Sequence, residues 1–284
     1  MSVRVLTDSV ADLPAEIVRR LGIEVVPLIL RFGAEEYRDG VDLSTEEFYR
    51  MLQARREFPT TATPSPTAFA EAYDRLSEQT DELLVIALSS GLSGTYQAAL
   101  QGRELMRHRP RVEVLDSGTA AIMEGFVAMR AAEAAQTGAS LEEAMEAARR
   151  AAARADMLCT FDTLEYLRRG GRIGAAAAFL GSLLKVNPLL TVRAGVVQPA
   201  GRTRSRAAAA DRLFEFAAGY GHIEELAVEH TACPEEAEAL LGRLSALHPR
   251  ERIILSKMTP VIGAHTGPGL LLVAVLGARR GPPA

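Results

Sequence analysis

The residues best suited to chemistry in this 284-residue sequence lie in one hydroxyl- and glycine-rich segment, Leu88–Ala99. The apolar run Leu83–Leu88 leads into it with the length and β-branched content of a strand, and a helical pattern follows from Tyr96 to Met106. In an open parallel sheet, such a loop lies at the carboxyl end of a strand, where ligands bind. The segment therefore predicts a cradle for a carboxylate or phosphate, or else an ordinary capped helix after a turn.

This segment offers two kinds of donor. The backbone N–H groups at the start of the helix suit an anion, and Gly91 and Gly94 allow the backbone to approach a bound group closely. The side-chain donors are the hydroxyls of Ser89, Ser90, Ser93 and Thr95.

A second hydroxyl cluster lies in Phe58–Pro66, where three prolines exclude a helix and favour an extended loop. Ser65 is explained as the cap of a helix over residues 66–78, whereas Thr61 is less readily explained that way. Asp8 and Ser9 follow the first predicted strand and either meet a ligand or cap a helix.

His265 lies in a glycine-rich stretch, Gly263–Gly269, that predicts a shaped loop. The histidine is either a ligand-binding group or a structural one. Two basic clusters, Arg168–Arg172 and Arg202–Arg206, either hold phosphate groups or are solvated surface charge.

One enzymatic alternative is a serine hydrolase acting on lipid esters. Gly91–Thr95 approaches the G-x-S-x-G pattern but has Thr95 where the second glycine belongs, and His265 and Asp116 are imaginable partners. Several serines compete for the nucleophile, and nothing in the sequence fixes their geometry. A nucleotide-binding enzyme is disfavoured, because the sequence contains neither a P-loop nor a dinucleotide-binding fingerprint.

Composition narrows the class of protein. A net charge of −4 without a long basic run argues against a nucleic-acid partner. Cys159 and Cys233 match no metal spacing, and we expect buried, reduced thiols in a cytoplasmic protein. No signal peptide or membrane span is visible, and we expect no metal and no cofactor.

The elements that must position these residues form two regions. From Val3–Leu6, through a helix opened by Pro14 and a second strand over Ile23–Phe32, strands alternate with helices up to residue 155. This alternation predicts an α/β domain with a mostly parallel sheet flanked by helices. Residues 156–284 mix a hairpin near residues 189–198 with helices and further strands, which predicts an α+β domain with a mixed sheet.

Five motifs together resemble the DegV family of bacterial fatty-acid-binding proteins, the acyl-carrying subunits of fatty acid kinase. They occur in family order over nearly the whole chain. They are Thr-Asp-Ser with Ala-Asp-Leu-Pro, Pro-Thr-Thr-Ala-Thr-Pro-Ser-Pro, Leu-Ser-Ser-Gly-Leu-Ser-Gly-Thr-Tyr, Leu-Arg-Arg-Gly-Gly-Arg-Ile and Gly-Ala-His-Thr-Gly-Pro-Gly.

The resemblance implies one long-chain fatty acid buried between the two domains. It implies that Thr61, Ser93 and His265 hold the carboxylate, with Ser90, Ser9 and Gly94 as further contributors. It also implies a separate ATP-binding kinase that converts the acid to an acyl phosphate in phospholipid metabolism. This chain would then be a non-catalytic carrier that makes transient membrane contact.

Arginines in the two basic clusters match regions that the family associates with the kinase. They are Arg172, Arg202 and Arg204. The acyl chain also requires an apolar tunnel, because an alkyl chain is stabilised by leaving water. We expect the tunnel wall to include Phe161, Ile173, Phe179, Leu180 and Leu184, although the same residues are equally consistent with plain core.

Overall fold

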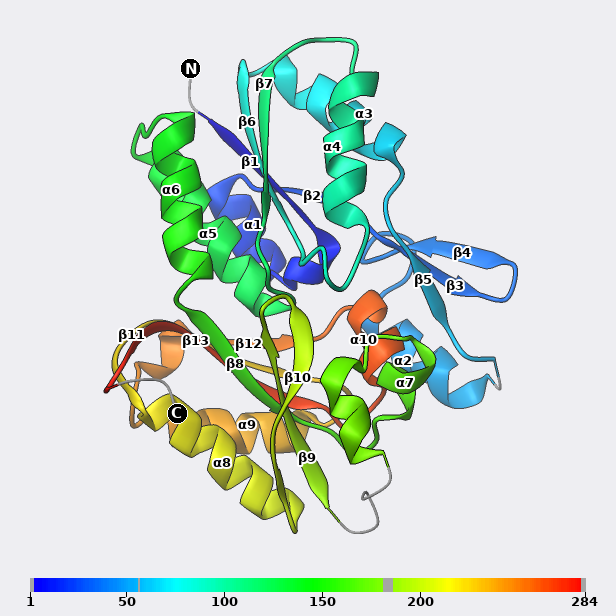
Figure 1. Ribbon diagram of the computed structural model, residues 1–284, viewed down its shortest axis with the longest axis vertical. Helices are drawn as coiled ribbons and strands as arrows, with labels where there is room; N and C mark the ends of the chain where they lie inside the picture. Colours follow the sequence, from blue (N-terminus) through cyan, green and yellow to red (C-terminus); the bar gives the residue numbers. More distant parts are fainter. Residues whose placement is uncertain (1–2, 56, 181–185, 282–284) are drawn as a thin grey trace.

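The computed structural model describes residues 3–55, 57–180 and 186–281 and shows two α/β domains stacked one above the other (Figure 1). The upper domain contains the N-terminus and a parallel sheet, and the lower domain contains a mixed sheet. The predicted fold class is confirmed. The exact boundary at residue 155 stays a prediction, although α6 (Leu141–Ala152) precedes it and β8 (Ala155–Thr160) already belongs to the second sheet.

The sheet of the first domain has the strand order β2-β1-β6-β7, with every neighbouring pair parallel. Its strands are β1 (Arg4–Asp8), β2 (Glu24–Val26), β6 (Glu82–Ala87) and β7 (Arg111–Asp116). Its helices are α1 (Ala15–Leu21), α3 (Pro66–Ser77), α4 (Thr95–Leu105), α5 (Ile122–Gln136) and α6. Side chains alternate across the strands, so Leu83 and Val85 pack with α3 and α4, and Leu84 and Ile86 pack with α5 and α6.

The predicted single strand Ile23–Phe32 is wrong, because the chain changes sheets at Pro27. Proline cannot donate a ladder hydrogen bond, and the next N–H, that of Leu28, donates to Ser9 Oγ at 3.1 Å instead. The chain continues as β3 (Ile29–Phe32) in a small antiparallel sheet with β4 (Glu35–Arg38) and β5 (Thr60–Ala62). The hydroxyl-rich segment Phe58–Pro66 is thus extended, as expected, and its residues Thr60–Ala62 are also hydrogen-bonded to β3. Helix α2 (Thr45–Ala54) connects β4 to β5.

The sheet of the second domain has the order β10-β9-β8-β13-β11-β12, with only β11 and β12 parallel. Its other strands are β9 (Asn187–Arg193), β10 (Val196–Thr203), β11 (Tyr220–His230), β12 (Ile253–Lys257) and β13 (Leu271–Arg279). Helices α8 (Arg206–Ala218) and α9 (Pro234–Leu244) cover one face of this sheet. Helix α5 packs between the other face and the first domain, which explains why most of its residues are buried.

The predicted loop around His265 is wrong, because most of it forms helix α10 (Pro260–Thr266). Pro260 suits a first helical turn, and buried carboxylates accept the N–H groups at its start. The helix contacts α2, β3 and β5, so this part of the second half of the sequence packs on the first domain.

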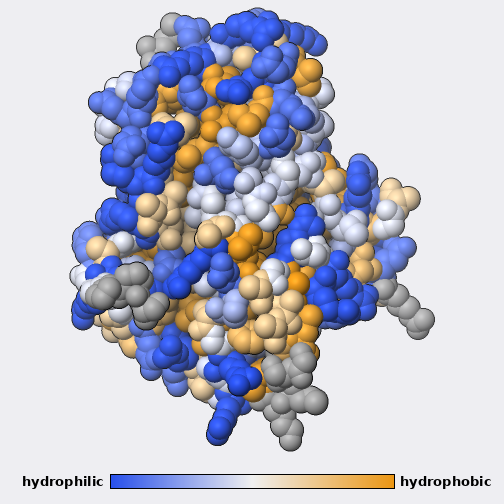
Figure 2. All heavy atoms as spheres, in the orientation of Figure 1, coloured by the Kyte–Doolittle hydropathy of each residue, from blue (hydrophilic) through white to orange (hydrophobic). Residues whose placement is uncertain are grey.

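The remaining elements are α7 (Glu165–Arg169) and the short 3-10 turns η1 (Ser9–Ala11), η2 (Gly174–Phe179) and η3 (Arg250–Arg252). Both cysteines are free thiols; Cys159 is buried as expected, whereas Cys233 is only half-buried. Figure 2 shows hydrophobic surface on the lower domain. Leu180 is among the exposed large hydrophobic residues. In the part of the chain that the structure describes, no helix has the length and apolarity needed to cross a membrane.

Candidate functional site

A cavity of about 120 Å³ lies where the two domains meet, and both contribute its walls. The first domain supplies η1, β5 and the loops that follow β6 and β7, and the second supplies β8, β9, β13 and α10. Its apolar walls include Val10, Leu28, Leu88, Leu92, Met157, Cys159, Phe161, Leu190, Val192, Val261, Ile262 and Leu272. The cavity thus suits a ligand that is mostly apolar.

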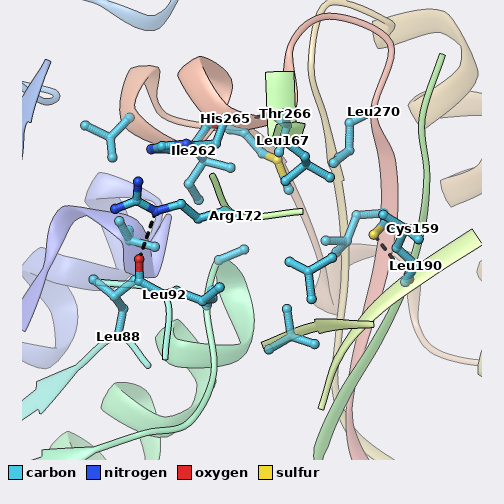
Figure 3. A pocket seen from close by; sticks show the side chains of 18 of the residues that line it. Leu88, Leu92, Cys159, Leu167, Arg172, Leu190, Ile262, His265, Thr266 and Leu270 are labelled. Carbon is cyan, nitrogen blue, oxygen red and sulfur yellow. Dashed lines mark hydrogen bonds between the residues drawn. The ribbon is translucent and has the colours of Figure 1, made fainter. Parts of the chain in front are cut away.

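Four polar side chains give the cavity one end at which an anion could be bound: Thr61, Ser93, Arg172 and His265. Figure 3 shows Arg172 and His265 on one side of the cavity, and Cys159 and Leu190 on the other. Thr61 Oγ1 lies 2.7 Å from His265 Nε2, and Ser93 Oγ lies 2.9 Å from Thr95 Oγ1. The hydroxyls that the sequence places in separate clusters are therefore brought to one cavity.

Two other threonines line the cavity, Thr266 and Thr191, and only Thr266 uses its hydroxyl in a hydrogen bond among the described residues. Thr266 Oγ1 donates to the Ile262 carbonyl within α10. Thr191 alternates with the cavity-facing Leu190 and Val192, so its side chain points to the α8 side of the sheet. Neither is placed to bind an anion in the cavity.

His265 is held in its neutral form. Burial, with a smaller contribution from the charge of Arg172, lowers the pKa of its imidazole to about 4. Nδ1 is buried and has no hydrogen-bond partner among the described residues, so Nε2 and its contact with Thr61 are the polar edge of the ring.

Two glycines let α7 and α10 approach closely enough to fix this ring. A Cβ on Gly170 would lie 2.2 Å from His265 Nδ1. A Cβ on Gly267, whose φ of +69° already disfavours other residues, would lie 2.2 Å from the Tyr166 ring.

Arg172, one of the three arginines that the resemblance makes candidates for kinase docking or phosphate contact, lines the cavity. Its Nε donates to the Leu92 carbonyl at 3.1 Å, a contact drawn in Figure 3, and Nη1 donates to the Gly170 carbonyl at 2.6 Å. These two bonds hold the guanidinium beside the serine loop that carries Ser93. Arg202 and Arg204, by contrast, are exposed at and just beyond the end of β10.

Three candidate carboxylate-binding residues lie away from the cavity wall. Ser9 is buried and uses its hydroxyl to donate to Asp39 Oδ2 at 2.7 Å. Ser90 is exposed, and its backbone N–H donates to Asp116 at 3.1 Å. Gly94 is exposed at the start of α4. The Ser9 hydroxyl also accepts from the Leu28 N–H at 3.1 Å, and the residue that caps η1 is its neighbour Asp8.

Of the expected tunnel residues that the structure describes, only Phe161 lines the cavity. Ile173 and Phe179 pack against the core, Leu180 is exposed, and Leu184 lies outside the described residues. The cavity walls missing from the prediction include strands β8, β9 and β13, whose apolar alternation could have suggested a cavity face but equally fits an ordinary core.

The residues considered for a serine hydrolase do not assemble a triad. Ser93 bonds to Thr95 rather than to His265, and His265 Nδ1, where a triad carboxylate would bind, has no partner among the described residues. The Asp116 carboxylate accepts from the backbone N–H groups of Ser90 and Gly118.

Replacing Gly170 with Ala tests whether the close approach of α7 positions His265. The backbone of Gly170 is right-handed helical, so alanine fits the backbone, but its Cβ forces the ring away from Thr61. We expect a shifted His265 ring signal by NMR and about tenfold weaker anion binding in the cavity, the effect of losing roughly one hydrogen bond. Gly242→Ala, in helix α9, is the matched control and should change neither quantity.

Comparisons with known proteins identify relatives of the whole chain. A model described as "Uncharacterised protein, DegV family" matches residues 2–277. A DegV domain-containing protein of Streptomyces coelicolor is 43% identical over 278 residues, covering 96% of this chain and 98% of that protein. A solved DegV family protein from Thermus thermophilus, described by its fatty acid binding, superposes with a TM-score of 0.90 at 33% identity, covering 98% of this chain and 100% of that one. DegV of Bacillus subtilis, described as a fatty acid binding protein, gives 0.89 at 32% identity, with 98% and 99% covered.

Proposed function

This chain belongs to the DegV family, as its motifs predicted, and from that premise we propose that it carries one long-chain fatty acid between its domains. The observation that carries the proposal is the composition of the cavity: its walls are apolar, and the polar groups free to bind an anion gather at one end. An amphipathic molecule with a single carboxylate matches that division.

The acyl chain supplies most of the binding free energy in this proposal. Each methylene removed from water contributes about 0.8 kcal/mol, so a long chain offers roughly 10 kcal/mol before the costs of association are subtracted. The walls at the far end of the cavity, around Cys159 and Leu190, are buried and suited to receive it.

The carboxylate is bound by hydroxyls in this proposal. We assign the imidazole proton of His265 to Nε2, because donation from Nε2 to Thr61 Oγ1 leaves the threonine hydroxyl free to donate to the ligand. Ser93 supplies a second hydroxyl, and Arg172 supplies a charge at the edge of the site. His265 then acts through Thr61 as a positioning residue.

We further propose that the bound acid is presented to a separate ATP-binding kinase for conversion to an acyl phosphate. Hydroxyl donors satisfy a buried carboxylate without a tight ion pair, which would lower its nucleophilicity. Arg202 and Arg204 are exposed and are candidates for contact with that kinase. Cytoplasmic location, transient membrane contact and a role in phospholipid metabolism remain predictions.

Native mass spectrometry of the purified protein tests the carrier function. We expect a stoichiometric adduct with the mass of a long-chain fatty acid, released on denaturation and identified after organic extraction. A protein that is empty as purified and also takes up no added palmitic or oleic acid would contradict the proposal.

A further inference from the structure

A group of buried carboxyls lies at the junction of the two domains, close to the cavity. Its members are Asp8, Asp12, Asp39, Glu124 and Glu229, each at most 5% exposed. None of them forms an ion pair with Lys, Arg or His in the described part of the chain. Buried carboxylates without cations are costly, so protons must be shared among them.

One pair in this group, Asp12 and Glu229, spans the domain interface. Asp12 follows η1 in the first domain, Glu229 is in β11 of the second, and the two buried carboxyls lie close enough for each to influence the pKa of the other. Both pack against the start of α5, since a Cβ on Gly125 would lie 2.5 Å from the carbonyl of Ala11, the residue before Asp12. Both Glu229 oxygens also accept bonds, from the Ile122 N–H at 3.2 Å and the Ser256 hydroxyl at 2.9 Å. Asp12 Oδ1 accepts from the Thr259 N–H at 3.0 Å.

The remaining oxygen, Asp12 Oδ2, locates the shared proton. It is buried and has no donor among the described residues, which is costly for a charged oxygen but suits a protonated one that donates to Glu229. The second pair, Asp8 and Glu124, shows the same arrangement, with Glu124 Oε2 as its oxygen without a donor.

The Asp12–Glu229 pair is connected to the cavity through two helices. Glu229 binds the first N–H of α5, next to the cavity-lining residues Ala120 and Ala121. Asp12 binds the N–H of Thr259, immediately before α10, the helix that carries His265. Asp39 adds a bond to the Val261 N–H at 3.2 Å. Loss of attraction within the pair would therefore loosen two walls of the cavity.

We propose that Asp12 and Glu229 form a proton-sharing latch between the domains, which positions α10 and His265 and releases the bound acid as the proton is lost. The inference rests on the proposed carrier function for its ligand, but the latch itself is a property of the empty protein.

The groups around the pair set the direction of its pH dependence. Asp39 and the Asp8–Glu124 pair add negative charge, and Tyr49 of α2 contributes only a buried phenol. Lys257 of β12 lies over the Tyr49 ring and pairs with Glu46. Burial raises the pKa of Glu229 to about 7, and burial together with the charge of Glu229 raises the pKa of Asp12 well above its usual value.

The folded protein therefore holds protons that the unfolded chain releases at about pH 4. Because the folded state binds more protons above that pH, these groups stabilise it fully in acid and progressively less as pH rises through 7 and beyond. Loosening of the latch is thus expected on the alkaline side.

Asp12→Asn tests the latch, because asparagine mimics the protonated acid. Its amide donates to Glu229, its oxygen accepts from Thr259, and it tolerates the left-handed backbone of position 12, where φ is +49°. For the natural protein, we expect the dissociation rate of a fluorescent fatty acid to rise about tenfold between pH 6 and pH 9, the effect of roughly one pKa unit. Asp12→Asn should keep the slow rate at both values, and Asp12→Ala should be fast at both.

Two ligand-free measurements separate the latch from the carrier function. The unfolding midpoint of the empty protein should fall with rising pH less steeply in Asp12→Asn than in the natural protein, and the variant should lose one infrared band of a protonated carboxyl at pH 7. The surface variant Glu142→Gln should change neither. If Asp12→Asn keeps the pH profile and the infrared bands of the natural protein, the latch is wrong even if fatty acid binds. If no fatty acid binds but both readouts change in Asp12→Asn, the latch stands and the carrier function fails.

Discussion

Thr61→Val combined with Ser93→Ala is expected to lower the affinity for palmitic acid by about 100-fold or more. Each hydroxyl that donates to a buried carboxylate contributes roughly 1.5–3 kcal/mol to the binding free energy. The two substitutions remove both donors while nearly preserving side-chain volume. The site also loses the acceptor for His265 Nε2, which leaves the imidazole without its one polar partner among the residues that the structure describes. Displacement of a fluorescent fatty acid measures the change.

A second ligand, which lacks the carboxylate, distinguishes loss of the carboxylate site from damage to the apolar cavity. Hexadecanol has the same apolar chain without the charge, so the double variant should bind it within a few-fold of the natural protein. A matched double variant remote from the cavity, Thr137→Val with Ser77→Ala, also removes two hydroxyls, each of which donates to a backbone carbonyl of its own helix. Equal losses for acid and alcohol would place the carboxylate elsewhere.

Cys159→Phe is expected to change the accepted chain length rather than the carboxylate site. Cys159 lines the cavity from β8, on the opposite side from Arg172 and His265, and a phenyl ring there occupies space needed by the end of the chain. Palmitic acid has eight more methylenes than octanoic acid, worth about 6 kcal/mol at 0.8 kcal/mol each. We expect its affinity to fall at least 100-fold, while that of octanoic acid stays within a few-fold.

Cys159→Ala is the control for this variant, because it removes the thiol but leaves the cavity open. Its affinity for palmitic acid should stay close to that of the natural protein, as measured by the same displacement titration with both acids. If Cys159→Phe folds with a normal circular dichroism spectrum and still binds palmitic acid unchanged, the acyl chain does not occupy this end of the cavity.

These variants address the two halves of an amphipathic ligand separately, because the structure keeps them on separate elements. The hydroxyl-bearing loops belong to the first domain, and most of the strands that wall the cavity belong to the second. A ligand therefore spans the domain junction, and any group that fixes this junction, such as the Asp12–Glu229 pair, also affects ligand retention.

The elements of regular structure follow largely from local patterns. Helices such as α3 and α6 begin at a serine cap, with Pro66 or a Glu143 capping box in the first turn, and these signals are readable in the sequence. Sequence patterning failed where a tertiary contact competed with it. The strand expected over Ile23–Phe32 is split because Leu28 bonds to Ser9, and the loop expected around His265 is a helix because Asp12 and Asp39 cap it from a distance.

The sequence by itself determined which residue types were available to bind an anion: hydroxyls on two loops, one histidine and a set of arginines. Only the tertiary structure decided which of them share a cavity, because Thr61 and His265 are 204 positions apart and meet through the packing of α10 on β5. The tertiary structure also places Arg172 in the cavity wall and Arg202 and Arg204 at the surface. An apolar side chain gives the same sequence signal whether it faces a neighbour or an empty space, so the cavity walls could be found only in three dimensions.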